Sequence, residues 1–188
     1  MSWTVIGILA LACFAMMLVE RSGLRTTLQT QFKGDIKRES RWWAQYGQGA
    51  CTAFVAVLLW QLDRGHTGAA VGLCIATFGS SFLCTLIKRS VGRVRPNREN
   101  AGKFLGPALK HANFRESFPS SHSASAIAMT VILASLYPQA AWTFWVLGIG
   151  CAVLRYLMDA HWPSDILGGI ALGGAGANIV CLAFRFQG

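Results

Sequence analysis

The stretch SASAIAMTVILASLYPQAAWTFWVLGIGCAVL, residues 123–154, contains no charged residue and decides the fold. It is too long for one membrane crossing, because a helix needs only about 20 residues to span the hydrocarbon core. The segment LYPQA at Leu136–Ala140 interrupts it with a proline, which ends a helix. The sequence therefore predicts two membrane helices joined by a tight connection.

Other apolar stretches extend this pattern along the chain. Three are free of charge, and a fourth has only glutamines as strongly polar residues: Met1–Val19, Thr67–Ile87, Ile166–Phe184 and Ala44–Leu62. The first has no basic residue at its start, so we expect a retained helix and not a cleaved signal peptide. We predict an all-α fold, a bundle of six transmembrane helices that forms one domain over residues 1–188.

Composition agrees with a membrane protein. Of 188 residues, 53% are hydrophobic, and the mean hydropathy is +0.42. The six cysteines all fall inside the expected spans, where cysteine behaves as a small apolar residue. We expect the bilayer and a lipid to be the partners of this chain, and no nucleic acid.

The net charge of +9 is concentrated in two connections. The first holds Arg21, Arg25, Lys33, Lys37, Arg38 and Arg41, and the other holds Lys88, Arg89, Arg93, Arg95, Arg98, Lys103, Lys110 and Arg115. If six helices alternate in direction, both connections share one face of the membrane with residues 159–164. Arg89, Arg93 and Arg98 are expected to face lipid or water.

The first connection also carries an apolar repeat. Leu24, Leu28, Phe32 and Ile36 recur every four residues among basic and polar neighbours, before the pair at residues 42–43, which are both tryptophan. This pattern predicts an amphipathic helix in the membrane interface after the first span, with a solvated basic linker as the alternative.

Three segments at the basic face combine residues suited to phosphate chemistry: KRSVGRVRP (88–96), PSSH (119–122) and RYLMDAHWPSD (155–165). Pro119 suits the first turn of a helix that begins near Ser120. The side chains and backbone amides of Ser120 and Ser121 would then face an anion. His161 and Asp165 are four residues apart. A carboxylate that accepts from Nδ1–H leaves the Nε2 lone pair free to attack phosphorus, and His122 is then available as acid and base.

The order and spacing of these residues resemble the type 2 phosphatidic acid phosphatase superfamily. The matching pattern is Lys88-x6-Arg95-Pro96, then Pro119-Ser120-x-His122, then Arg155-x5-His161-x3-Asp165. Ser121 stands where the family usually has glycine, and Leu154 stands where a serine often precedes the arginine. Neither change removes a side chain with a chemical role.

The resemblance implies a phosphatase that needs no metal and no cofactor. His161 would be the nucleophile, Asp165 its orienting partner and His122 the general acid, while Lys88, Arg95, Ser120, Ser121 and Arg155 would bind the phosphate. The eight acidic residues are dispersed along the sequence, with no evident two-metal carboxylate site.

The expected substrate is a lipid phosphate at the membrane surface. Within the resembling superfamily the candidates include phosphatidate, phosphatidylglycerol phosphate, polyprenyl diphosphate and the phosphates of lipid A. A lipid phosphotransferase with the same covalent intermediate and a lipid-phosphate binding or transport protein are the alternatives.

The charge pattern and the resemblance disagree on orientation. Positive-inside counting places the basic face in the cytoplasm, whereas the resembling bacterial enzymes commonly act on the outer side of the inner membrane. We expect a bacterial inner-membrane protein with an extracytoplasmic active site.

Overall fold

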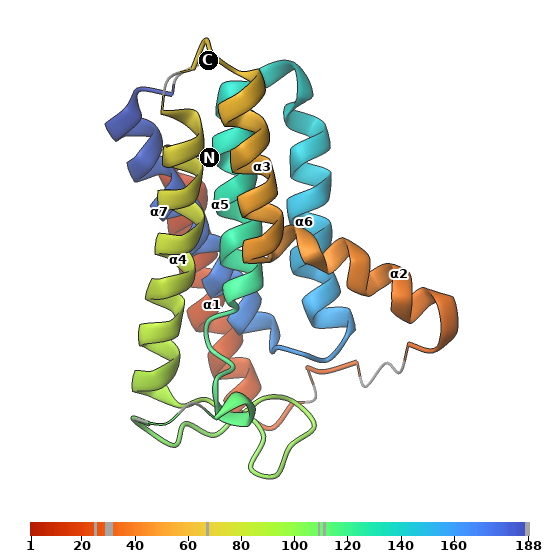
Figure 1. The fold of residues 1–188 in the computed structure, drawn as a ribbon. Helices are drawn as coiled ribbons and strands as arrows, with labels where there is room; N and C mark the ends of the chain where they lie inside the picture. Colours follow the sequence, from red (N-terminus) through yellow and green to blue (C-terminus); the bar gives the residue numbers. More distant parts are fainter. Residues whose placement is uncertain (25, 29–31, 67, 109, 111, 187–188) are drawn as a thin grey trace.

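The computed structural model describes residues 1–24, 26–28, 32–66, 68–108, 110 and 112–186. The described chain is helical, with no strand in these ranges. Seven α-helices follow one another: α1 (Trp3–Arg21), α2 (Gly34–Ala44), α3 (Gly49–Leu62), α4 (Ala69–Val91), α5 (Ser121–Leu136), α6 (Ala141–Leu157) and α7 (Pro163–Phe184). Six of them run up and down in one bundle, and α2 projects from its side (Figure 1).

The prediction of six full spans is supported only in part. Four helical segments are long and apolar enough to cross a membrane, namely α1, α4, α7 and residues 138–157, which include α6. Helices occupy the other two expected positions but are shorter, with 14 residues in α3 and 16 in α5. At 1.5 Å per residue they extend about 21 and 24 Å, less than the roughly 30 Å of hydrocarbon. The long apolar helices indicate an integral membrane protein.

Helix α5 forms the centre of the bundle. It packs against α4, α6 and α7, and every residue from Ser123 to Leu133 is buried. Close approach to α7 depends on glycine, because a Cβ on Gly173 would lie 2.1 Å from the carbonyl oxygen of Ala124. Helix α5 carries no charged residue of the Asp, Glu, Lys or Arg type and is mostly apolar after its first turn, which suits it to this position. The predicted break after it is present: α5 ends at Leu136, and a short 3-10 turn leads into α6.

The helix after the first span begins later than the apolar repeat suggests. Leu24, Leu28 and Phe32 lie outside any helix, and α2 starts at Gly34. Some residues of this connection, including Arg25, are outside the described ranges. Helix α2 crosses the direction of the long helices (Figure 1), as a helix in the plane of an interface would.

Candidate active site

The three chemical segments come together at one end of the bundle. Lys88 and Arg155 lie in the last turns of α4 and α6, which end there. Helices α5 and α7 begin at the same end, with His122 and Asp165 in their first turns. His161 lies in the connection just before α7.

The start of α5 presents hydroxyl groups beside a lysine. Ser120 is the N-cap, and its side-chain oxygen accepts from the Ser123 amide at 3.4 Å. The Lys88 ammonium donates to the Ser121 hydroxyl at 2.6 Å. Pro119 precedes the N-cap, so the expectation that it occupies the first helical turn is wrong. Helix N-termini with adjacent cations attract anions.

Two arginines border this region in different ways. The Arg95 guanidinium donates to three backbone carbonyls, those of Asn113 at 2.8 Å, Ala160 at 3.1 Å and Glu116 at 3.3 Å. Arg155 is held less firmly, since its Nε is buried with no hydrogen-bond partner among the described residues. Backbone contacts therefore fix Arg95, whereas Arg155 has donor capacity to spare.

His161 and Asp165 are neighbours inside the protein. The His161 Nδ1 lies 3.5 Å from the Asp165 Oδ2, and the two side chains are 1% and 0% exposed. This contact falls short of hydrogen-bond geometry, and Nδ1 has no hydrogen-bond partner among the described atoms. Asp165 Oδ2 already accepts from the Ser117 hydroxyl at 2.5 Å and the Trp162 amide at 2.9 Å, which occupies its two lone pairs.

Burial keeps the imidazole of His161 neutral. It lowers the pKa of His161 to about 4, although the Asp165 carboxylate acts in the opposite direction. The positive charges of Arg95 and Lys88 lower this pKa further. At neutral pH the ring therefore has a free nitrogen lone pair.

His122 belongs to the same electrostatic cluster. It interacts with the positive charges of Arg155, Lys88 and Arg95. Its backbone is tightly packed against the turn before α3, because a Cβ on Gly47 would lie 2.3 Å from the His122 carbonyl oxygen. A cavity of about 330 Å³ between α3, α4 and α5 reaches this histidine.

Arg93 occupies a position that the sequence did not predict. The expectation that it faces lipid or water is wrong, because its side chain is 1% exposed. Its Nη1 lies 2.6 Å from Asp165 Oδ1, and its Nη2 lies 2.7 Å from Glu20 Oε2. Arg93 thus joins the end of α1 to the start of α7.

Further contacts complete this buried network. The Arg93 Nη1 donates to the Ser164 hydroxyl at 2.6 Å, and that hydroxyl donates to Glu20 at 2.5 Å. The guanidinium also lies over the rings of Phe104 and Trp162, at 5.4 and 5.3 Å. No sequence motif identifies this group of residues. Glu20 could have indicated it, because an acidic residue at the end of an apolar span usually faces the protein interior.

The other charged residues behave differently. Arg89 and Arg98 are exposed, as expected. His66 is also exposed, whereas His111 lies outside the described residues. Within the described ranges, no group of three or more His, Cys, Asp or Glu side chains is arranged to hold a metal ion.

Comparison with known proteins gives relatives that match about half of this chain. A lipid A 1-phosphatase of Rhizobium etli is 39% identical over 97 residues, which are 50% of this chain and 41% of that protein. A lipid A 1-phosphatase of Rhizobium johnstonii is 35% identical over 107 residues, or 56% of this chain and 43% of that protein. The chain therefore aligns with less than half the length of either relative, and no solved structure matches it significantly.

The match to a protein family is wider. It runs over residues 69–188, which include α4 to α7 and all the predicted site residues. Since the helices that bring Lys88, His122, His161 and Asp165 to one end of the bundle all lie within it, the chain belongs to the PAP2 superfamily.

Proposed function

We propose that this protein is a membrane phosphatase that removes a phosphate group from a lipid through a phosphohistidine intermediate. The observation that carries the proposal is the buried His161, whose pKa is lowered to about 4 and whose Nδ1 lies 3.5 Å from Asp165. Such an imidazole is uncharged at neutral pH and is available as a nucleophile.

Phosphate binding is assigned to the cations and hydroxyls around the start of α5. Lys88, Arg95 and Arg155 supply positive charge, and Ser120 and Ser121 stand at the helix N-terminus. Arg155 contributes a donor that is unpaired among the described residues. Hydrogen bonds to charged groups are worth about 1.5–3 kcal/mol each, so several focused on one phosphoryl group contribute strongly to catalysis.

The reaction proceeds in two displacements. The Nε2 of His161 attacks phosphorus, and the bond between phosphorus and the ester oxygen breaks as His122 protonates the leaving oxygen. His122 then removes a proton from water, whose oxygen attacks the phosphohistidine, and inorganic phosphate leaves. The Asp165 carboxylate, 3.5 Å from Nδ1, stabilises the positive charge of the imidazole in the intermediate.

The names of the relatives suggest the first substrate to test. Both are lipid A 1-phosphatases, so we propose lipid A 1-phosphate as the leading candidate. The test is a phosphate-release panel with this lipid, phosphatidate and a polyprenyl diphosphate, measured with a chelator present. We expect activity without added metal, and its loss in His161→Ala and His122→Ala.

Four results would contradict the proposal. Activity that disappears with chelator would argue for a metal-dependent reaction, and full activity in either histidine variant would argue against the assigned roles. Lipid binding without turnover by the wild-type protein would favour a binding protein. Transfer of the phosphate to a second lipid or a sugar in place of water would identify a phosphotransferase.

We further propose that the active site faces the extracytoplasmic side of a bacterial inner membrane. Asn100 lies in the connection at the catalytic end, and Arg64 lies at the opposite end. In a cysteine-free background, Asn100→Cys should react with an impermeant maleimide added outside cells, and Arg64→Cys should not. The reverse labelling would place the site in the cytoplasm.

A further inference from the structure

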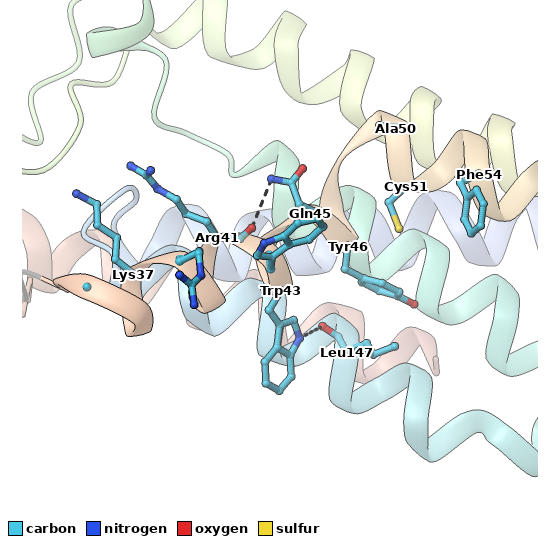
Figure 2. A pocket seen from close by; sticks show the side chains of 12 residues that line it. Lys37, Arg41, Trp43, Gln45, Tyr46, Ala50, Cys51, Phe54 and Leu147 are labelled. Atoms are coloured by element: carbon cyan, nitrogen blue, oxygen red, sulfur yellow. Dashed lines mark hydrogen bonds between the residues drawn. The ribbon is translucent and has the colours of Figure 1, made fainter.

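A groove of about 870 Å³ lies between α2, the start of α3 and α6 (Figure 2). Its chemistry changes along its length. Lys37 and Arg41 stand at one end, and Cys51 and Phe54 at the other. A basic end followed by an apolar channel matches the two parts of a phospholipid.

The basic end has charge available for a ligand. Lys37 and Arg41 are four residues apart on α2, so they lie on the same face of the helix, and both are exposed. Arg38 is engaged by two acids, Asp35 at 3.1 Å and Glu39 at 3.4 Å. Lys37 and Arg41 form no ion pair with any described residue, so two positive charges remain for an anion.

The apolar end is open to the side of the bundle. Phe54 is 64% exposed, and Leu147 of α6 lines the opposite wall. Trp42, which follows Arg41 in the sequence, also lines the groove and is 70% exposed. Tryptophan at the boundary of a polar and an apolar region is typical of the headgroup level of a membrane.

Helix α2 is attached to α6 beside the groove. The Trp43 indole nitrogen donates to the Leu147 carbonyl at 3.1 Å (Figure 2). Gly150 makes room for this ring, since a Cβ there would lie 2.5 Å from it. One wall of the groove is thereby attached to α6.

We propose that this groove binds an anionic glycerophospholipid of the surrounding bilayer. Its phosphodiester lies between Lys37 and Arg41, and one acyl chain follows the groove toward Phe54. The occupant is a resident lipid and not the substrate, because the groove shares no lining residue with the cavity at His122. Gln45 and Tyr46 line the groove, whereas Gly47 packs against His122.

Native mass spectrometry of the full chain, with equal amounts of phosphatidylglycerol and phosphatidylcholine, tests this proposal. The wild type should retain phosphatidylglycerol preferentially. In Lys37→Gln/Arg41→Gln, affinity for it should fall about 30-fold, since each cation near the surface contributes about a fivefold gain for anionic lipid. Arg89→Gln/Arg98→Gln removes the same charge from two exposed residues outside the groove and should leave affinity near that of the wild type.

Two more variants separate the groove from general surface charge. Leu147→Trp fills the apolar channel without changing charge and should weaken phosphatidylglycerol binding several-fold. Lys37→Arg/Arg41→Lys keeps both charges and should bind normally, which also shows that α2 tolerates substitution at these positions. The thermal unfolding midpoint in detergent verifies that each variant is folded.

The proposal is overturned if the wild type shows no preference for phosphatidylglycerol. It is equally overturned if both charge-removing variants lose binding alike, or if Leu147→Trp binds as well as the wild type. Because phosphatidylglycerol has no phosphomonoester and binding is measured without turnover, these outcomes are independent of whether the protein is a phosphatase.

Discussion

The Arg93 guanidinium lies 2.6 Å from the Asp165 carboxylate, and both side chains are almost fully buried. Its second terminal nitrogen pairs with Glu20 at 2.7 Å. One buried cation is thus shared between two carboxylates. Because Glu20 balances the charge of Arg93, the negative charge of Asp165 is not cancelled and acts on His161.

Replacing Arg93 should therefore lower the activity of the site, although Arg93 is not among the residues assigned to phosphate binding. Arg93→Ala leaves two buried carboxylates without their cation, and such a change typically costs about 3–5 kcal/mol. We expect a lower unfolding midpoint and at least a 100-fold lower kcat, with a smaller change in KM. Phosphate-release kinetics and thermal unfolding in detergent measure these effects.

Arg93→Lys is the matched variant. It restores the charge but not the planar pair of nitrogens that bridges Glu20 and Asp165, so partial recovery of both stability and kcat is expected. A kcat in Arg93→Ala equal to that of the wild type would show that Asp165 needs no positioning by this arginine.

Glu20→Gln tests the charge balance separately. The amide keeps an oxygen that accepts from Arg93 and Ser164, but it removes the negative charge, so Arg93 would partly neutralise Asp165. The positively charged imidazole of the intermediate is then less stabilised. We expect about a tenfold lower kcat with little loss of folding, given the size of single charge effects in buried sites. An unchanged kcat would mean that Asp165 acts independently of Glu20.

The contrast between Arg93 and Arg95 shows what the sequence reveals and what it hides. Arg95 belongs to a motif with fixed spacing, so its place near the phosphate site was an expectation from sequence alone. Arg93 is two residues away with no recognisable spacing to its partners, and Glu20 is distant in the sequence. Charge that is buried by tertiary contacts has the same sequence signature as charge at a membrane surface.

The positions of the bundle helices could be predicted from the sequence, but their lengths could not. Uncharged stretches located all six bundle helices, because hydrophobicity is a local property. The start of α3 depends on Gly47, where the backbone must fit against His122 of a distant segment. Likewise, the apolar repeat from Leu24 to Ile36 did not locate the start of α2, which lies at Gly34.

Gly47 leads to a prediction about the position of His122. A Cβ at this residue would lie 2.3 Å from the His122 carbonyl oxygen, a distance that requires the backbone to shift. Gly47→Ala should lower kcat markedly, because a misplacement of about 1 Å can cost 100-fold. Gly79→Ala on α4 is the control, since its Cβ would meet nothing within 4 Å. Equal activity of the two variants would show that His122 is not displaced.

Variants of Arg155 and Arg89 distinguish a positive charge that contacts the phosphate from one that only attracts anionic lipid to the surface. Arg155 lies in the site with a buried Nε that has no hydrogen-bond partner in the described part of the chain, whereas Arg89 is exposed on the last turn of α4. Arg155→Gln should reduce kcat/KM by 100-fold or more, and Arg89→Gln by about fivefold at most, as expected for attraction of an anionic lipid. Comparable losses in a phosphate-release assay would argue against the assignment of Arg155 to the phosphate.

The pH dependence of stability should depend on His161. Burial lowers the pKa of His161 from 6.5 to about 4 in the folded protein, so below pH 6.5 the unfolded chain binds a proton that the folded chain excludes. The free energy of unfolding therefore decreases as the pH falls from 6.5 toward 4, and this effect is absent above pH 6.5. His161→Gln removes it, so the difference in stability between wild type and variant should shift by roughly 2–3 kcal/mol between pH 7 and pH 4.5. Chemical unfolding in detergent at these two pH values measures the shift. If the difference in stability between wild type and variant is the same at both pH values, His161 takes up a proton as readily in the folded protein as in the unfolded chain.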